Sequence, residues 1–165
     1  MKAKPGQPLV NDNWQEWWSS RHMHGRSDLT ESIRAWNGAS NQDIVNGWLA
    51  AEDTLTFSEF DEATNTWEFG IIMCSENYEE ILPLLVFCES ISQYKLFSPH
   101  DFAIIYPYFW GDSNVMAYMT DSQEGFVLSL AESVTDVAKD HLDYAASRLG
   151  EKWEKFEEKF TSSLA

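Results

Sequence analysis

The chain has 165 residues, of which 44% are hydrophobic and 15% aromatic, and its formal net charge is −16 at pH 7. This length predicts a single domain, and the wealth of aromatic residues excludes the disordered class. The charge disfavours nucleic acids and anionic membranes as partners, because both are bound through Lys and Arg. It favours a basic protein surface instead, although acidity also serves solubility.

An irregular N-terminal arm is expected over residues 1–26, followed by one domain over residues 27–165. Pro, Gly and Asn residues early in the arm favour loops. The arm then carries Trp14, Trp17 and Trp18 at helical spacing. These side chains are candidates for an exposed docking patch, because Trp is enriched in binding hot spots. The alternative is that they pack the arm onto the domain.

Two short helices are predicted next. Asp28 and Glu31 have the spacing of a capping box, ahead of an apolar stripe that stops near Gly38. Ser40 and Asp43 repeat this spacing ahead of a second apolar stripe. The acidic setting disfavours DNA as a target of this helical pair.

The apolar period then changes to two, which predicts a hairpin with strands over 54–60 and 66–74. The segment 81–93 leaves helix and strand open. Asn77 and Glu80 resemble a capping box, whereas Pro83 suits only a first helical turn and the run 84–87 fits a buried strand equally well. A helix is the preferred interpretation.

Three further strands are predicted over 102–110, 115–119 and 126–130, and a long helix over 131–160. The element order is therefore ααββαβββα. Hairpin connections imply an α+β fold with one mainly antiparallel sheet of about five strands, an N-terminal helical pair, a middle helix and a long C-terminal helix.

The charge is concentrated in the middle of the chain. Residues 27–147 hold 21 of the 27 Asp and Glu but three of the 11 Lys and Arg, an excess of −18. This concentration favours an acidic face that steers a basic partner. Its predicted partner-binding residues are Glu52, Asp53, Glu59, Asp61, Glu62, Glu68, Glu76, Glu79 and Glu80, together with Trp14, Trp17 and Trp18.

The two cysteines, Cys74 and Cys88, both lie in apolar runs and do not form a disulfide framework. No stretch reaches the ~20 apolar residues of a membrane span, and the N-terminus does not resemble a secretory signal. These features predict a cytoplasmic protein. Acidic neighbours also make either thiol a poor nucleophile.

The histidines offer weak catalytic or metal-binding signals. His22 and His24 have the spacing of two ligands on a strand, but the arginines around them oppose a bound cation. His100 beside Asp101 could pair as base and orienting acid, and His141 fits a partly buried helix position. No phosphate-binding glycine loop is present. We therefore predict no catalytic residue, no metal site and no cofactor.

The preferred hypothesis is an acidic module that inhibits or escorts a basic protein, such as an immunity-type inhibitor of a toxin or nuclease, or a mimic of nucleic-acid charge. One alternative is a dedicated chaperone of a secreted protein. Another is a small enzyme that uses a His–carboxylate pair. Self-association through the last helix into a homodimer is a further possibility.

Overall fold

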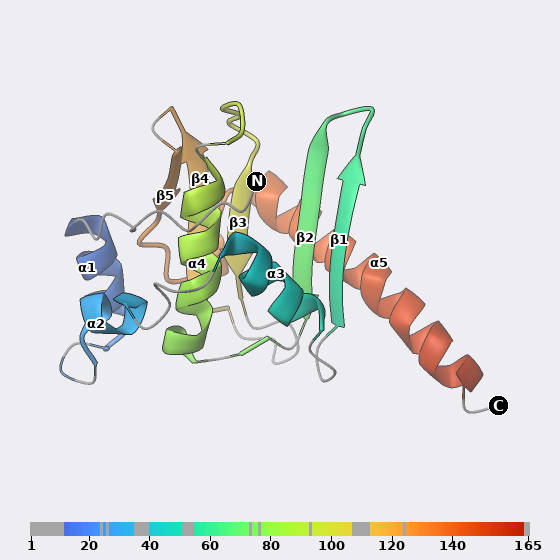
Figure 1. The fold of residues 1–165 in the computed structure, drawn as a ribbon, viewed down its shortest axis with the longest axis horizontal. Coiled ribbons are helices and arrows are strands. Elements are labelled where there is room, and N and C mark those ends of the chain that lie inside the picture. The colour runs from blue at the N-terminus through green and yellow to red at the C-terminus, as the bar shows by residue number, and fades with distance from the viewer. Residues whose placement is uncertain are drawn as a thin grey trace.

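The computed structural model describes residues 12–23, 25, 27–34, 40–50, 55–72, 74, 75, 77–92, 94–106, 113–123 and 125–163. Its element order is three helices, a hairpin, a helix, three strands and a final helix (Figure 1). The α+β class predicted from the sequence is confirmed.

Helices α1 (Asp12–Ser20), α2 (Leu29–Arg34) and α3 (Asn41–Leu49) precede the strands. The predicted caps are present. The Asp43 backbone N–H donates to Ser40 Oγ at 3.1 Å, and the Ser40 N–H donates to Asp43 Oδ2 at 3.0 Å, which completes a capping box. The Glu31 N–H donates to Asp28 Oδ1 at 2.9 Å. These short-range bonds fix where α2 and α3 begin.

The predicted hairpin is confirmed as β1 (Leu55–Asp61) and β2 (Thr66–Ile72), which pair antiparallel. Asn65 adopts a φ of 55° in the turn, a conformation that Asn tolerates better than most residues. Side chains alternate between the two faces of a strand. Glu59 and its cross-strand partner Glu68 therefore share one face, while Trp67 and Phe69 lie on the other.

The segment left open between helix and strand forms helix α4 (Tyr78–Ser92). Its buried residues cover most of its circumference: Ile81, Leu82, Pro83, Leu85, Val86, Phe87, Cys88 and Ser90. A helix buried on nearly all sides has no amphipathic period, so the sequence pattern alone is ambiguous. Pro83 lies beyond the first turn, and the tertiary packing of its neighbours offsets the backbone hydrogen bond that it cannot donate.

The second sheet contains β3 (Phe102–Ile105), β4 (Ala117–Ser122) and β5 (Gly125–Leu128) in the order β3-β4-β5, all antiparallel. The expectation of a single five-strand sheet is corrected to separate sheets of two and three strands. The predicted strand over 102–110 stops at Ile105, and residues 107–112 lie outside the described ranges.

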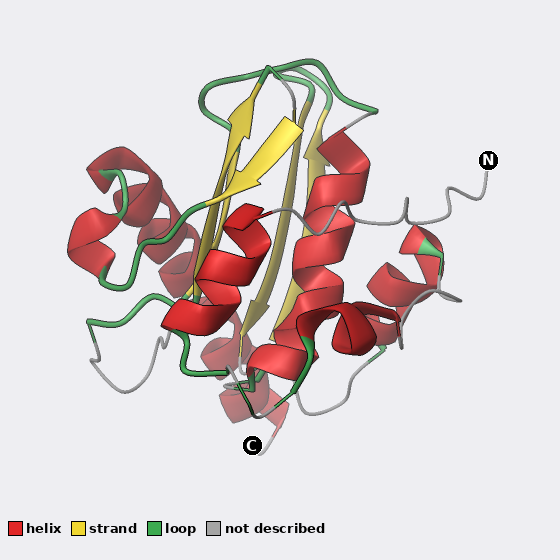
Figure 2. Ribbon diagram, turned by 90° about the vertical axis from the view of Figure 1, so that its left-hand side faces the viewer, coloured by secondary structure: helices red, strands yellow, loops and turns green. Residues whose placement is uncertain are grey.

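Helices cover both faces of the strands (Figures 1 and 2). Alternating residues of β4 divide the core: Ala117 and Met119 join the cluster built by α1–α4, whereas Tyr118 joins a second cluster on the opposite face. That second cluster includes Val137 and is covered partly by Leu142 of the last helix. The three-stranded sheet is therefore a middle layer.

The predicted helix over 131–160 is divided into a 3-10 turn, η1 (Val134–Asp136), and helix α5 (Lys139–Ser163). Ser133 and Asp136 form a capping box on η1, and Val137 returns to an extended conformation before α5 begins. Of the helices described, none has both the length and the apolar character needed to cross a bilayer.

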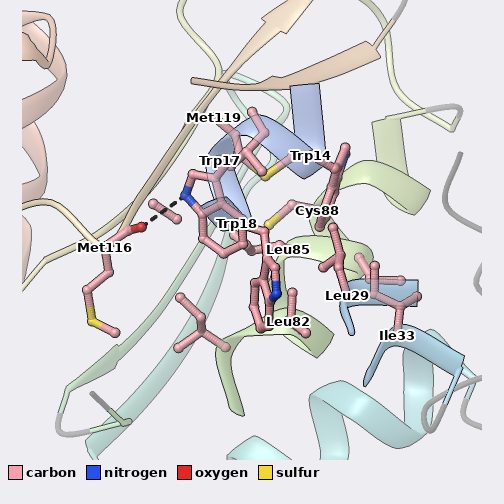
Figure 3. Packing of buried hydrophobic residues seen from close by; sticks show 14 of the residues in the cluster. Trp14, Trp17, Trp18, Leu29, Ile33, Leu82, Leu85, Cys88, Met116 and Met119 are labelled. Atoms are coloured by element: carbon pink, nitrogen blue, oxygen red, sulfur yellow. Dashed lines mark hydrogen bonds between the residues drawn. The ribbon is translucent and has the colours of Figure 1, made fainter. Parts of the chain in front are cut away.

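The tryptophans of α1 do not form an exposed docking patch; the alternative, that they pack the arm onto the domain, is the one observed. Trp14, Trp17 and Trp18 are 2%, 0% and 3% exposed, and they pack against α2 and α4 (Figure 3). Trp17 Nε1 donates to the Met116 carbonyl at 3.1 Å. Burial of this much apolar surface outweighs any gain from displaying it. Since α1 supplies core residues, a boundary at residue 26 does not separate two packing units.

Candidate functional site

The charged face of the β1–β2 hairpin is bound to α5. Arg148 donates to Glu68 Oε2 from Nε at 2.9 Å and from Nη2 at 2.7 Å, and Nη2 also lies 3.0 Å from Glu59 Oε2. Lys152 pairs with Glu59, and the Tyr144 hydroxyl donates to Glu68. Two carboxylates that would repel each other across the strands are thus neutralised by cations one helical turn apart.

This network removes two residues from the predicted acidic face. The hydrogen bond from Lys152 lowers the pKa of Glu59, and the hydrogen bond to Glu68 raises the pKa of Arg148. Both shifts keep the Glu59 carboxylate and the Arg148 guanidinium ionised. Glu59 and Glu68 therefore serve first to attach the hairpin to α5, a role that sequence reasoning missed because their partners lie 76 or more positions away.

The remaining predicted carboxylates lie at two ends of the molecule. Asp61 and Glu62 are exposed at the β1–β2 turn, where Asp61 accepts hydrogen bonds from Thr64 Oγ1 and the Ala63 N–H, both at 2.9 Å; these bonds lower its pKa. Glu79 and Glu80 are exposed at the start of α4. That start lies at the opposite end of the strands from the turn (Figure 1). No continuous patch unites all four.

Glu52, Asp53 and Glu76 lie outside the described residues. In the described part of the chain, many exposed carboxylates form no ion pair. They are Asp12, Glu16, Asp28, Glu31, Asp61, Glu62, Glu79, Glu80, Glu132, Asp136, Asp140 and Glu154.

The cations are mostly committed internally. Lys95, Lys139, Arg148 and Lys152 form ion pairs with carboxylates of the same chain, and the buried Arg21 donates to the Ala131 carbonyl. Among the described residues this leaves Arg34 and Lys155 as exposed cations outside an ion pair. The surface therefore carries a large uncompensated negative charge.

A loop that sequence reasoning did not single out follows α4. Within it, Tyr94, Leu96 and Phe97 are 66%, 87% and 51% exposed. Leu96 is the most exposed large apolar side chain among the described residues. The signal in the sequence was a short apolar run just before Ser98 and Pro99, at a position where the helical period has ended.

Ion pairs and a hydrogen bond to buried or partly buried carboxylates hold this loop in place. Lys95 Nζ donates to Asp101 Oδ2 at 2.7 Å and pairs with Asp121, whose side chain is 2% exposed. The Ser98 N–H donates to Asp121 Oδ2 at 2.9 Å. Burial alone would lower the pKa of Lys95, but its hydrogen bonds to the two carboxylates raise it above the ordinary value. The Lys95 ammonium that holds the loop therefore stays charged at neutral pH.

The histidines do not form a catalytic arrangement in the part of the chain described. His141 Nδ1 lies 2.9 Å from the Tyr118 hydroxyl, and its ring stacks on Phe102 at 4.3 Å, so it is a packed core residue. His100 is exposed, while the neighbouring Asp101 pairs with Lys95. His22 lies in the turn after α1 with a φ of 57°, and His24 is outside the described residues.

Neither cysteine is activated. Burial raises the pKa of Cys88 to about 12, and burial followed by the charge of Glu80 raises the pKa of Cys74. Both shifts disfavour the thiolate that nucleophilic attack requires. Within the described ranges, no group of three or more His, Cys, Asp or Glu side chains is placed to hold a metal ion.

A small hollow in the described part of the chain lies beside the loop that follows α4. The hollow beside the loop is lined by Ser92, Lys95, Phe97, Asp121, Ser122, Gln123 and Gly125 and holds about 180 Å³. Typical ligand pockets occupy roughly 300–1,000 Å³. Comparisons with protein-family models, with curated proteins and with solved structures find no match to this chain.

Proposed function

We propose that this protein is an acidic binding module that inhibits or escorts a basic protein partner. The observation that carries the proposal is the imbalance on its surface. The cations of the described residues are largely used in internal ion pairs, whereas a dozen or so exposed carboxylates have none. A surface of this kind attracts cationic proteins over long range and repels copies of itself.

Exposed charges contribute more to the rate of encounter than to the stability of a complex. The carboxylates at Asp61 and Glu62 and those at Glu79 and Glu80 would therefore steer the partner. Inhibition of a basic toxin or nuclease, or imitation of nucleic-acid charge, is the preferred form of this activity. Escort of a secreted protein uses the same surface and differs in the identity of the partner.

A reducing compartment, the cytoplasm, belongs to the same proposal. Cys74 and Cys88 are both free thiols, and no disulfide joins them. Free buried cysteines are common where thiols are kept reduced. The alternative of a small enzyme with a His–carboxylate pair has less support. His141 forms a hydrogen bond with the Tyr118 hydroxyl and not with a carboxylate, and Asp101, the neighbour of His100, forms an ion pair with Lys95.

Affinity capture with a salt titration tests the proposal. The full chain is immobilised, exposed to lysate of the cells that encode it, and eluted from about 0.1 M to 1 M salt, over which the Debye length falls from about 10 Å to about 3 Å. Support requires a basic protein whose measured affinity falls with salt and falls again with Asp61→Asn/Glu62→Gln or Glu79→Gln/Glu80→Gln. Binding that ignores both salt and these substitutions would overturn it.

A further inference from the structure

The loop of Tyr94, Lys95, Leu96 and Phe97 presents apolar side chains to solvent at fixed positions. Single exposed apolar residues are common on protein surfaces and need no explanation. Here three of four consecutive residues are more than half exposed, beside a backbone tied down by hydrogen bonds. Exposed apolar side chains gathered on one ordered loop and bordered by polar residues favour an interaction site.

The loop's internal contacts give it the order that docking needs. Asp121 accepts from Lys95 and from the Ser98 N–H while its side chain remains buried, and the Lys95 ammonium also lies 5.1 Å from the centre of the Phe126 ring. The Tyr94 N–H donates to the Ile91 carbonyl at 2.9 Å, which continues the end of α4 into the loop. A loop ordered before binding loses little entropy on binding.

We infer that the 94–97 loop is the apolar anchor of the docking surface, with Leu96 and Phe97 inserted into an apolar hollow bordered by Lys or Arg on a basic protein. This inference rests on the proposed function. One ammonium, that of Lys95, faces two carboxylates, so the base of the loop is negative. The Asp101 side chain is 38% exposed and offers a carboxylate to a cation at the rim.

The negative charge of the chain favours a basic protein over a second copy of the chain at this loop. A second copy of the chain also carries a net charge of −16, so self-association at this loop is opposed by repulsion between the two copies. The β1–β2 turn, which carries exposed Glu62, lies at the same end of the strands as the loop, whereas α4 begins at the other end (Figure 1). A partner seated on the loop therefore meets additional carboxylates at that end.

Direct titration tests the anchor with the basic protein recovered by salt elution. Leu96→Ser and Phe97→Ser are each expected to weaken binding about ten-fold or more, as hot-spot truncations do, with the salt dependence unchanged. Leu49→Ser is the matched control, because Leu49 is 45% exposed on α3. If the loop variants and the control bind the basic protein with equal affinity, the loop is not the anchor, whereas the proposed function is unaffected.

Photo-crosslinking separates that failure from failure of the proposed function. A benzophenone amino acid is placed at position 96, or at position 49 as control, and the full chain is irradiated inside the cells that encode it. The expected result is an adduct to a protein of basic isoelectric point from position 96 alone. Adducts to a second copy, or none from position 96, overturn the inference. An adduct to an acidic protein overturns the basic partner on which both proposals depend.

Discussion

The ring of Phe57 lies over the α-carbon of Gly70, its direct partner across the β1–β2 hairpin. A methyl group added at Gly70 would overlap that ring. The Lys152 ammonium, 5.1 Å from the ring centre, lies on the same side of the hairpin. The absence of a side chain at position 70 is therefore part of how the hairpin meets α5.

Replacing this glycine should strain the hairpin. We expect Gly70→Ala to lower the free energy of unfolding by about 1–3 kcal/mol, the range of overpacking substitutions. Phe57→Leu in the same chain should recover part of the loss, since a smaller side chain makes room. A double-mutant cycle in urea measures the coupling. Additive effects of the two changes would show that the overlap is relieved without cost.

The Arg148 network should stabilise the fold more than an ordinary surface pair. Arg148→Gln leaves Glu59 and Glu68 facing each other with Lys152 as the remaining cation of their network. We expect a loss of about 1–2 kcal/mol, since hydrogen bonds between charged groups exceed the few tenths of a kcal/mol of exposed pairs. Lys139→Gln, which breaks an exposed pair with Asp143 on the same helix, is the control. Equal losses from the two changes would contradict this role.

Glu89 should make stability fall as pH rises. Burial raises the pKa of this α4 carboxyl to about 7 from an ordinary value of 4.5, and its Oε2 atom is buried without a hydrogen-bond partner. An acid whose pKa is higher in the folded state favours folding while protonated, so its stabilisation is lost between pH 4.5 and about pH 7. Glu89→Gln should therefore exceed wild type in melting temperature at pH 8 and match it below pH 4.5. A constant difference across this range would argue against the assignment.

The N-terminal helix should be required for folding. Trp17 is fully buried and donates to the Met116 carbonyl. We expect Trp17→Ala to cost about 3–5 kcal/mol, as large core truncations do, and deletion of residues 1–26 to abolish the cooperative melt followed by circular dichroism. Trp67→Ala, at a tryptophan that is 39% exposed on β2, should cost less. A deletion that still melts cooperatively would restore the boundary at residue 26.

Local features of the fold were predictable from the sequence, and long-range ones were not. The Ser40–Asp43 cap and the β1–β2 hairpin depend on neighbours a few positions apart, and both were confirmed. Helix α4 was ambiguous because burial on nearly every side erases the helical period. The expected single sheet failed because strand patterns do not specify which hairpins join.

At the candidate site too, local composition was predictable from the sequence and long-range pairing was not. An excess of acidic residues is visible in composition, but the identity of the paired carboxylates is not, since Glu68 meets Arg148 across 80 positions. The tryptophans of α1 were compatible with docking or packing until the core around them was known. The 94–97 loop escaped notice because an apolar run after a helix is usually interpreted as the end of its buried stripe.

The two sheets also bear on how the chain reaches its native state. Among the described residues, every strand pair joins neighbours in the sequence: β1 with β2, β3 with β4, and β4 with β5. The β1–β2 and β4–β5 connections are short, and pairing strands that are neighbours in the sequence loses little chain entropy, a topology that favours rapid folding. We expect the contacts between α5 and the hairpin, which are long-range, to form late in folding. Since these are ionic at Glu59 and Glu68, added salt should speed unfolding more than it slows folding.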